Sequence, residues 1–166
     1  LCCGVHVHAQ RMAVKTNTLG WLTASPNVEA EFVLGRHISL NMGVAANPIS
    51  TDNFKTTFTH FQPEVRYWLN RPMVSHFLGV TAFANNFNML VKDVHHKGDA
   101  LAVGLTYGYA WVLNDHWNIE ATAGIGVMRY RQFKYDKGAP KPDAANDSKT
   151  TLAPVKLGVS FVYIIR

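Results

Sequence analysis

The sequence predicts an all-β fold, an eight-stranded antiparallel up-and-down transmembrane β-barrel, from three observations. Apolar and polar residues alternate with a period of two in successive segments, as side chains do in a pleated strand. Tight turns and longer polar stretches alternate between these segments, as in outer-membrane barrels. Charged residues of both signs fall on the polar faces, which a barrel in lipid turns toward its interior. The length of 166 residues suits one such domain.

The composition agrees with strands that face lipid. Charged residues make up 16% of the chain, against about 25% in typical soluble domains. The longest apolar stretch without a charge, residues 100–114, is shorter than the roughly 20 residues that a membrane-spanning helix needs. The net charge of +5 is scattered, without a basic run or a nucleic-acid motif. We therefore expect no nucleic-acid partner, and favour contact with anionic headgroups or lipopolysaccharide.

The N-terminal segment is interpreted as the end of a secretory signal peptide. A cleavage site after Ala9 would remove residues 1–9 as a residual signal peptide and leave residues 10–166 as a single barrel domain. The cysteines, Cys2 and Cys3, are adjacent, so neither a bridge between them nor a metal site is expected. A lipid anchor on Cys3 is the alternative to its removal with the signal peptide.

Four segments in the first half of the chain alternate as strands do. They span residues 12–22, 26–34, 38–45 and 57–69. Gly35 and Arg36 join the second to the third in a tight turn, which makes this pair the clearest hairpin. Residues 47–56 carry Asn, Pro, Ser, Thr and Asp and are predicted to be a loop. Pro63 lies inside the fourth segment, where proline normally indicates a sheet edge or a bulge.

Four further segments complete the predicted barrel. They span residues 76–85, 100–113, 118–128 and 156–163. In the first of these, we expect the face with Leu78 and Val80 to point outward, because the opposite face contains Gly79 and Thr81. In the second, small residues lie on one face and large ones on the other, as a narrow barrel wall requires. Seven aromatic residues are interpreted as interfacial girdles: Trp21, Trp68, Tyr107, Tyr109, Trp111, Trp117 and Tyr163.

The connections predict the orientation of the barrel. Long loops are expected at residues 47–56, 86–99 and 132–149, and tight turns at the opposite rim, although the link after the first strand is short. Outer-membrane barrels keep short turns in the periplasm and long loops outside the cell. We therefore predict a bacterial outer-membrane location with both termini in the periplasm.

The last strand resembles the recognition strand that the barrel-assembly machinery reads in outer-membrane proteins. Gly158, Phe161 and Tyr163 are predicted to be this assembly signal, with Phe161 and Tyr163 on the outward face. The chain continues to Arg166, whereas such strands usually end in phenylalanine.

Seven charged residues are predicted to form an ion-pair network inside the barrel: Lys15, Glu29, Glu31, Glu64, Arg66, Glu120 and Lys156. Unpaired buried charge is costly, so mutual pairing is the favoured interpretation, and a proton path or a cation site is the alternative. An eight-stranded barrel is just wide enough for its own side chains, so a diffusion pore is not expected.

Six short segments carry a family resemblance. They are residues 15–17 (Lys-Thr-Asn), 26–29 (Pro-Asn-Val-Glu), 62–69 (Gln-Pro-Glu-Val-Arg-Tyr-Trp-Leu), 76–80 (His-Phe-Leu-Gly-Val), 107–109 (Tyr-Gly-Tyr) and 117–120 (Trp-Asn-Ile-Glu). Together they resemble the domain of unknown function 3575 family of Gram-negative outer-membrane barrels over essentially all of residues 14–166. The resemblance implies the fold and location argued above and supplies no established activity or catalytic residues. A link of some members to fimbrial gene clusters implies a surface or fimbrial protein partner.

No catalytic residue and no cofactor is predicted. His95 and His96 are weak candidates for metal ligands, because adjacent histidines seldom point at one ion without further ligands. His60, Ser75, His76 and His116 invite comparison with lipid hydrolases, but spacing alone does not bring a nucleophile, a base and an acid together.

We therefore predict a non-enzymatic outer-membrane barrel with a structural or surface-interaction role. Its partners would be outer-membrane lipid and lipopolysaccharide, the barrel-assembly machinery, and a surface protein that contacts loops 86–99 and 132–149. The alternatives are a lipid-modifying outer-membrane enzyme, a narrow channel, and a soluble lipocalin-like ligand-binding barrel.

Overall fold

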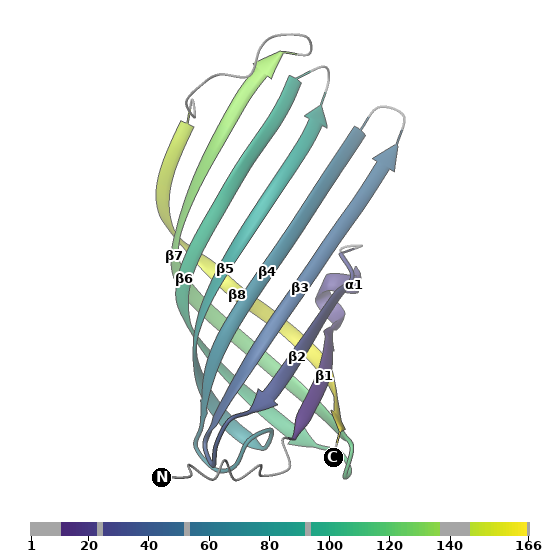
Figure 1. Cartoon of the computed structure of the whole chain (residues 1–166), viewed down its shortest axis with the longest axis vertical. Coiled ribbons are helices and arrows are strands. Elements are labelled where there is room, and N and C mark those ends of the chain that lie inside the picture. Colours follow the sequence, from purple (N-terminus) through teal and green to yellow (C-terminus); the bar gives the residue numbers. More distant parts are fainter. Residues whose placement is uncertain (1–10, 23–24, 52–53, 92–93, 137–146, 166) are drawn as a thin grey trace, which may run out of the picture.

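The computed structural model describes residues 11–22, 25–51, 54–91, 94–136 and 147–165, with side chains for all of these except 47–58, 87–97 and 132–148. Within this part, the strands are β1 (Met12–Asn17), β2 (Asn27–Val33), β3 (Ile38–Thr51), β4 (Phe54–Trp68), β5 (Ser75–Val91), β6 (Val94–Val112), β7 (Trp117–Asp136) and β8 (Asp147–Ile165), and a short helix, α1 (Thr18–Leu22), follows β1. The strands pair antiparallel in sequence order and close into one barrel (Figure 1). The predicted eight-stranded antiparallel barrel is thus confirmed. No helix among the described residues is long and apolar enough to cross a membrane.

The two faces of each strand differ as the alternation predicts. On β6, Leu101, Val103 and Leu105 are 56–65% exposed, whereas Ala102 and Thr106 are nearly fully buried. The choice of outward face on β5 is also confirmed, since Leu78 and Val80 are more than half exposed, while the opposite face is buried. The wall therefore turns its large apolar side chains outward.

The outward apolar residues form a band of limited height. On β6 the band runs from Leu101 to Trp111, and on β7 from Trp117 to Val127. Each run covers ten residue steps, which is about 25 Å of barrel height at about 3.3 Å per residue and a strand tilt of about 40°. The next outward position beyond Leu101 is Asp99, which is exposed and marks the end of the band.

The two rims of the barrel differ in the way the sequence predicts. The short connections 34–37, 69–74 and 113–116 lie at the rim where β8 ends, and the β3–β4, β5–β6 and β7–β8 hairpins rise at the other rim (Figure 1). The predicted loops within these hairpins are wrong in extent, because strand pairing continues through most of residues 47–56 and 86–99. These residues include types that favour loops, but the backbone ladder continues through them. Residues 137–146 of the third predicted loop lie outside the described part.

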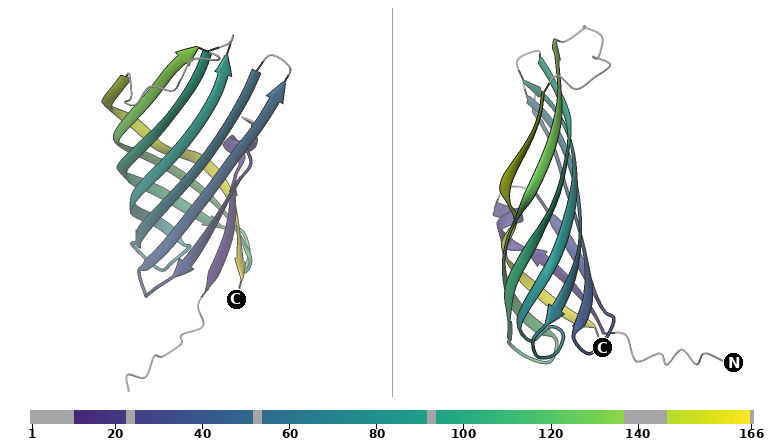
Figure 2. Two further views of the ribbon diagram at one scale, coloured as in Figure 1. Left: turned by 45° about the horizontal axis from the view of Figure 1, so that its top comes forward. Right: turned by 90° about the vertical axis from the view of Figure 1, so that its left-hand side faces the viewer.

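The first predicted strand, residues 12–22, is wrong in its second half. β1 ends at Asn17, whose side-chain oxygen accepts a hydrogen bond from the Leu19 amide at 3.0 Å and so caps α1. Asn27 holds the other side of this turn, because its side-chain oxygen accepts the amide of Asn17 at 2.7 Å. β1 and β2 therefore have six and seven residues, and the hairpins β3–β8 rise well past them (Figures 1 and 2).

Two irregularities shape the longer strands. Pro63 lies in an interior strand, not at the predicted edge or bulge: β4 pairs with β3 through Pro63, and its ladder with β5 skips only Gln62 and Pro63 without a change of register. A bulge is found instead on β8, where Gly124 pairs with Lys156 but Ile125 pairs with Pro154. Val155 is the extra residue, so it and Lys156 both turn inward.

Candidate functional site

The interior of the barrel is filled in layers, beginning with an apolar base. Met73, in the turn after β4, packs against Ala13, Val162 and Ile164. Its φ of 66° is in the left-handed region, and its carbonyl accepts a hydrogen bond from the Asn118 side chain at 2.6 Å. This turn therefore folds back into the barrel and closes its base.

The second layer is aromatic and corrects one prediction. Trp68 is fully buried inside the barrel and does not belong to an outward girdle. Its indole N–H donates to the Ser39 hydroxyl at 2.8 Å, and its ring packs against Phe77 with a centroid distance of 4.7 Å. Phe77 also lies 4.3 Å below the guanidinium of Arg66, which is a cation–π contact between this layer and the next.

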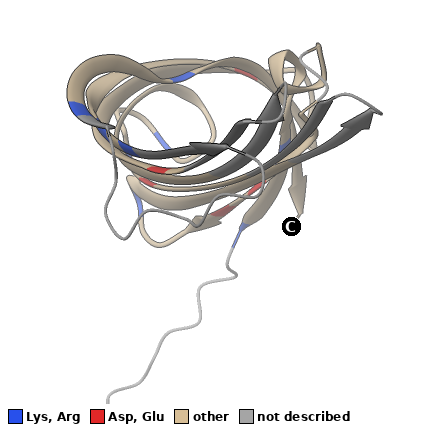
Figure 3. Cartoon of the chain, turned by 90° about the horizontal axis from the view of Figure 1, so that it is seen from above, with Lys and Arg blue, Asp and Glu red and all other residues tan. Residues whose placement is uncertain are grey.

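The third layer is a cluster of charged side chains, and it contains all seven residues that the sequence suggests. They come from β1, β2, β4, β7 and β8, are at most 8% exposed, and include four carboxylates and three cations: Lys15, Glu29, Glu31, Glu64, Arg66, Glu120 and Lys156. Acidic and basic positions are spread around the wall when the barrel is viewed from above (Figure 3). We call these seven residues the charge cluster.

Arg66 is the centre of the charge cluster. Its guanidinium lies 3.1 Å from the carboxylate of Glu31, 2.8 Å from that of Glu64 and 3.0 Å from that of Glu120. These carboxylates come from three different strands, so one side chain ties together β2, β4 and β7. The planar guanidinium has five N–H donors and suits such multiple contacts.

The two lysines complete the cluster from neighbouring positions on the wall. Lys15 contacts Glu31 and lies 2.6 Å from Glu120. Lys156 lies 2.8 Å from Glu29 and 3.0 Å from Glu64. Every carboxylate of the cluster therefore has at least one cationic partner.

Neutral donors compensate for the excess of carboxylates over cations. Each glutamate accepts a hydrogen bond from one uncharged side chain: Ser39 for Glu31, Asn41 for Glu29, Thr106 for Glu64 and Thr122 for Glu120. These donors were not among the predicted site residues, although the period of two already puts them on inward faces. Among the described side chains, only the oxygens of Asn41 and Asn118 are buried without a partner. The cluster is thus a nearly saturated polar layer that fills the cross-section of the barrel.

The histidine and serine residues considered for catalysis lie in different places. His60 points inward from β4, where its ring contacts the Asn85 oxygen at 2.6 Å. His76 faces outward and shares a hydrogen bond of 2.6 Å with the Tyr107 hydroxyl. His116, in the turn after β6, stacks on Tyr163 with a centroid distance of 6.0 Å. These contacts join none of the three histidines to Ser75.

The predicted metal and N-terminal sites fall largely on undescribed residues. His95 and His96 lie in β6, but their side chains are outside the described part. Among the side chains that are described, no group of three His, Cys, Asp or Glu residues could hold a metal ion. The signal peptide prediction for residues 1–9 and the prediction for Cys3 also lie outside the described residues.

The residues of the predicted assembly signal lie on both faces of β8. Phe161 and Tyr163 point outward, with 45% and 41% of their surface exposed, and Tyr163 packs on Trp117 at 5.0 Å. Gly158 points inward, where an added Cβ would overlap the side chain of Asn17. The glycine is thus required by the close approach of β1.

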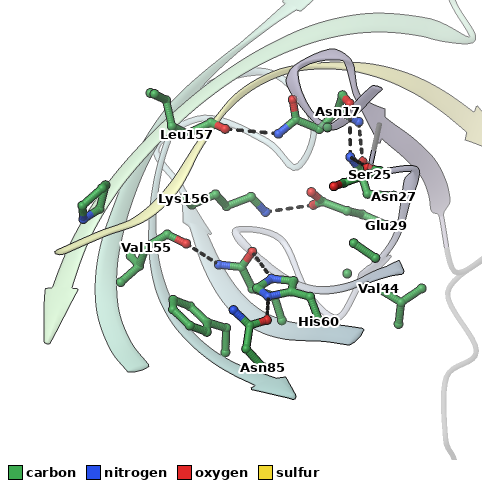
Figure 4. Close-up of a pocket in the computed structure, with 16 residues that line it drawn as sticks. Asn17, Ser25, Asn27, Glu29, Val44, His60, Asn85, Val155, Lys156 and Leu157 are labelled. Atoms are coloured by element: carbon green, nitrogen blue, oxygen red, sulfur yellow. Dashed lines mark hydrogen bonds and ion pairs between the residues drawn. The ribbon is translucent and has the colours of Figure 1, made fainter. Parts of the chain in front are cut away.

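A cavity lies beyond the charge cluster, on the side of the tall hairpins. It has a volume of about 300 Å³ and receives residues from β1, β2, β3, β4, β5 and β8, together with Gly20 of α1 and Ser25. Lys156 and Glu29 reach toward each other across it, and His60 and Asn85 lie together on one side (Figure 4). We call this space the upper chamber.

Two comparisons with known proteins bear on identity. A family model described as "Protein of unknown function (DUF3575)" matches residues 1–165, which is essentially the whole chain. A search of curated proteins gives no significant match.

Proposed function

Since the chain belongs to the DUF3575 family of proteins of unknown function, we propose from its structure that it is a non-enzymatic, non-conducting β-barrel of the bacterial outer membrane. Its termini would face the periplasm, and its tall hairpins would contact lipopolysaccharide or a surface protein. The observation that carries this proposal is the inverted polarity of the barrel. A layer of charged side chains crosses the interior above the apolar base and the aromatic layer, and an apolar band covers the outside.

The inverted polarity supports a lipid surrounding over water. A soluble eight-stranded barrel would bury apolar side chains in its interior and expose polar ones. Here residues such as Leu105, Ile125 and Leu157 are 56–66% exposed, while Arg66 and Glu31 are fully buried. The band is about 25 Å high, which is also the height of the apolar band of outer-membrane barrels.

The edge of the apolar band next to the short turns, which we call the lower edge, has side chains that favour a membrane interface. Next to each of the three short turns, a histidine stacks on an outward tyrosine: His37 on Tyr67, His76 on Tyr107 and His116 on Tyr163. Such rings have an apolar body and a polar tip, which suits the headgroup level of a bilayer.

The filled interior supports a role without conduction. The charge cluster and the apolar base both cross the lumen, and an eight-stranded barrel is only wide enough for its own side chains or one small ligand. The role would then rest with the outer surface and the hairpins. The narrow-channel alternative requires an ion path through paired charges, which the cluster does not offer.

The upper edge of the band supports lipopolysaccharide as the partner. Arg129 and Arg131 lie on β7 directly beyond Val127, and both are exposed on the outward face. In the proposed orientation this is the level of the outer-leaflet phosphates. A cationic side chain near an anionic membrane surface contributes about 1 kcal/mol to binding.

We predict that the double variant R129Q/R131Q retains less lipopolysaccharide than the unchanged protein when both are purified in mild detergent. Two arginines at about 1 kcal/mol each would lower the affinity by about 30-fold. The measurement is the lipopolysaccharide-to-protein ratio, with binding to purified lipopolysaccharide as the quantitative readout. The matched control is R36Q/R71Q, which removes the same charge from exposed positions at the other rim. Equal loss in both double variants would contradict a site at the upper edge.

A further inference from the structure

The barrel wall is lower at β1 and β2 than elsewhere. The β1–β8 ladder ends at the pair Asn17–Ser160, and the β2–β3 ladder ends at Asn27–Ala45. A six-residue ladder has five steps and rises about 13 Å along the barrel axis at about 3.3 Å per residue and about 40° of tilt. In the described part of the chain, the paired wall here thus ends about 12 Å below the top of the apolar band.

The upper chamber lies directly behind this low part of the wall. Its lining includes Asn17, Gly20 and Asn27 from the β1–α1–β2 region, and Ala45 from the neighbouring strand β3. On the other side it is lined by residues 154–157 of β8, which lie beyond the end of the β1–β8 ladder. The chamber therefore reaches the level at which β3 and β8 have no strand between them (Figures 1 and 4).

The polar side chains that line the chamber are one ion pair and several uncharged groups that form hydrogen bonds. The charged side chains of its lining are Lys156 and Glu29, and the ammonium of Lys156 lies 2.8 Å from the carboxylate of Glu29. The carboxylate of Glu64 lies 3.0 Å from the same ammonium. The remaining polar side chains near the cluster are His60, Gln62 and Asn85. A charged ligand would have to displace a buried ion pair. An uncharged one that donates and accepts hydrogen bonds would only exchange the hydrogen bonds of His60, Gln62 and Asn85.

The apolar groups of the chamber lie on the side of β8 and β5. The bulge on β8 turns Val155 inward, where it packs with Phe83. Pro154 and Leu157 border the chamber from the outward face of β8, where both are exposed. Outside, α1 exposes Trp21 and Leu22, with 60% and 81% of their surface uncovered. An aliphatic chain would thus meet apolar groups from the chamber to the outside of the wall.

We propose that the upper chamber binds an uncharged amphiphile, whose hydroxyl- or amide-bearing head lies beside His60, Gln62 and Asn85 and whose aliphatic chain leaves past α1. This inference rests on the proposed function, because the chain must end in lipid. The volume of about 300 Å³ is at the lower end of ligand pockets, so the head is of the size of one small polar group or one sugar ring.

Hexyl β-D-glucoside is a suitable probe, because it has such a head and a short chain and stays monomeric at millimolar concentration. The full chain in lipid nanodiscs is titrated with it, and amide chemical shifts are followed by NMR. We expect saturable shifts at Asn17, Ser25, His60 and Asn85. Glucose alone and hexanol alone should bind at least tenfold more weakly, since each lacks half of the contacts. Hexyl sulfate and hexylammonium should also bind at least tenfold more weakly, because Lys156 and Glu29 are already paired with each other at 2.8 Å.

Two neighbouring alanines give a matched pair of variants. Ala45 points into the chamber and Ala46 points outward on the same strand. A45F should fill the chamber and weaken binding at least tenfold, and A46F should leave it unchanged. Asn85 and Asn86 offer a second pair, N85L against N86L, in case A45F fails to fold.

Two failures are distinguishable. A chain that stays in buffer without detergent refutes the proposed function. If the chain inserts into the membrane, only the binding site in the chamber is in question. That site is refuted if the amide shifts rise linearly without saturation, if they spread over the outward residues, or if they remain in A45F and N85L. Tighter binding of either charged amphiphile than of the glucoside would overturn the assignment of an uncharged head.

Discussion

Replacing Arg66 by methionine is expected to lower the free energy of unfolding by about 3–5 kcal/mol, which is the usual effect of removing one partner from a buried ion pair. The variant would leave Glu31, Glu64 and Glu120 with only Lys15 and Lys156 as cationic partners. The cluster already has four carboxylates for three cations, so the loss raises the uncompensated buried charge. Methionine keeps most of the side-chain volume, which separates the effect of charge from that of a cavity.

The measurement is denaturant unfolding in lipid vesicles, followed by tryptophan fluorescence. R36M is the matched control, because it removes the same group from an exposed turn position, and its effect should stay within about 0.5 kcal/mol. Adding E120Q to R66M should recover part of the stability, since it removes one of the unpaired charges. A loss below about 1 kcal/mol for R66M would show that the cluster is not what holds the barrel interior together.

Replacing both Phe161 and Tyr163 by serine is expected to abolish assembly of the barrel in the cell. The two side chains lie outward on β8, the strand that closes the barrel by pairing with β1. The sequence predicts that β8 carries the assembly signal, and in that case the assembly machinery would read this face. The measurement is surface display of an epitope in one of the tall hairpins, together with the amount of heat-modifiable protein.

The matched control is L101S/V103S, which removes two outward apolar side chains from β6 without touching the terminal strand. We expect this control to assemble at reduced stability. Normal surface display of F161S/Y163S would contradict an assembly signal on the terminal strand. Loss of display in both double variants would mean that apolar area, and not an assembly signal, decides insertion.

The sequence predicts the wall of the barrel well, because the alternation of side chains depends only on the pleat of the backbone and on which face is buried. The seven charged residues of the cluster could be selected in the same way, since charge on an inward face needs a partner. Their pairing could not, because Arg66 meets Glu31 and Glu120 across the lumen, from strands far apart in the sequence. The register between strands decides such contacts, and it cannot be inferred from one sequence.

The parts that sequence patterns missed have physical reasons. The tall hairpins are rich in residue types that favour loops, such as the Asn, Pro, Ser and Asp of residues 47–53, and yet the backbone still pairs there. The end of β1 depends on side-chain to backbone hydrogen bonds of Asn17 and Asn27, which compete with the ladder. Trp68 shares its inward face with Arg66, so the period of two outweighs the preference of tryptophan for an interface. The bulge at Val155 changes the phase within one strand, and with it the position of the upper chamber.

The proposed membrane location is tested most directly by cell fractionation combined with a gel that compares heated and unheated samples. We predict that the protein appears in the outer-membrane fraction and that the unheated form migrates differently from the heated one, because a closed barrel resists detergent until it is boiled. Recovery in the soluble fraction, with no change of mobility on heating, would contradict the account of an apolar band that faces lipid around a charged interior.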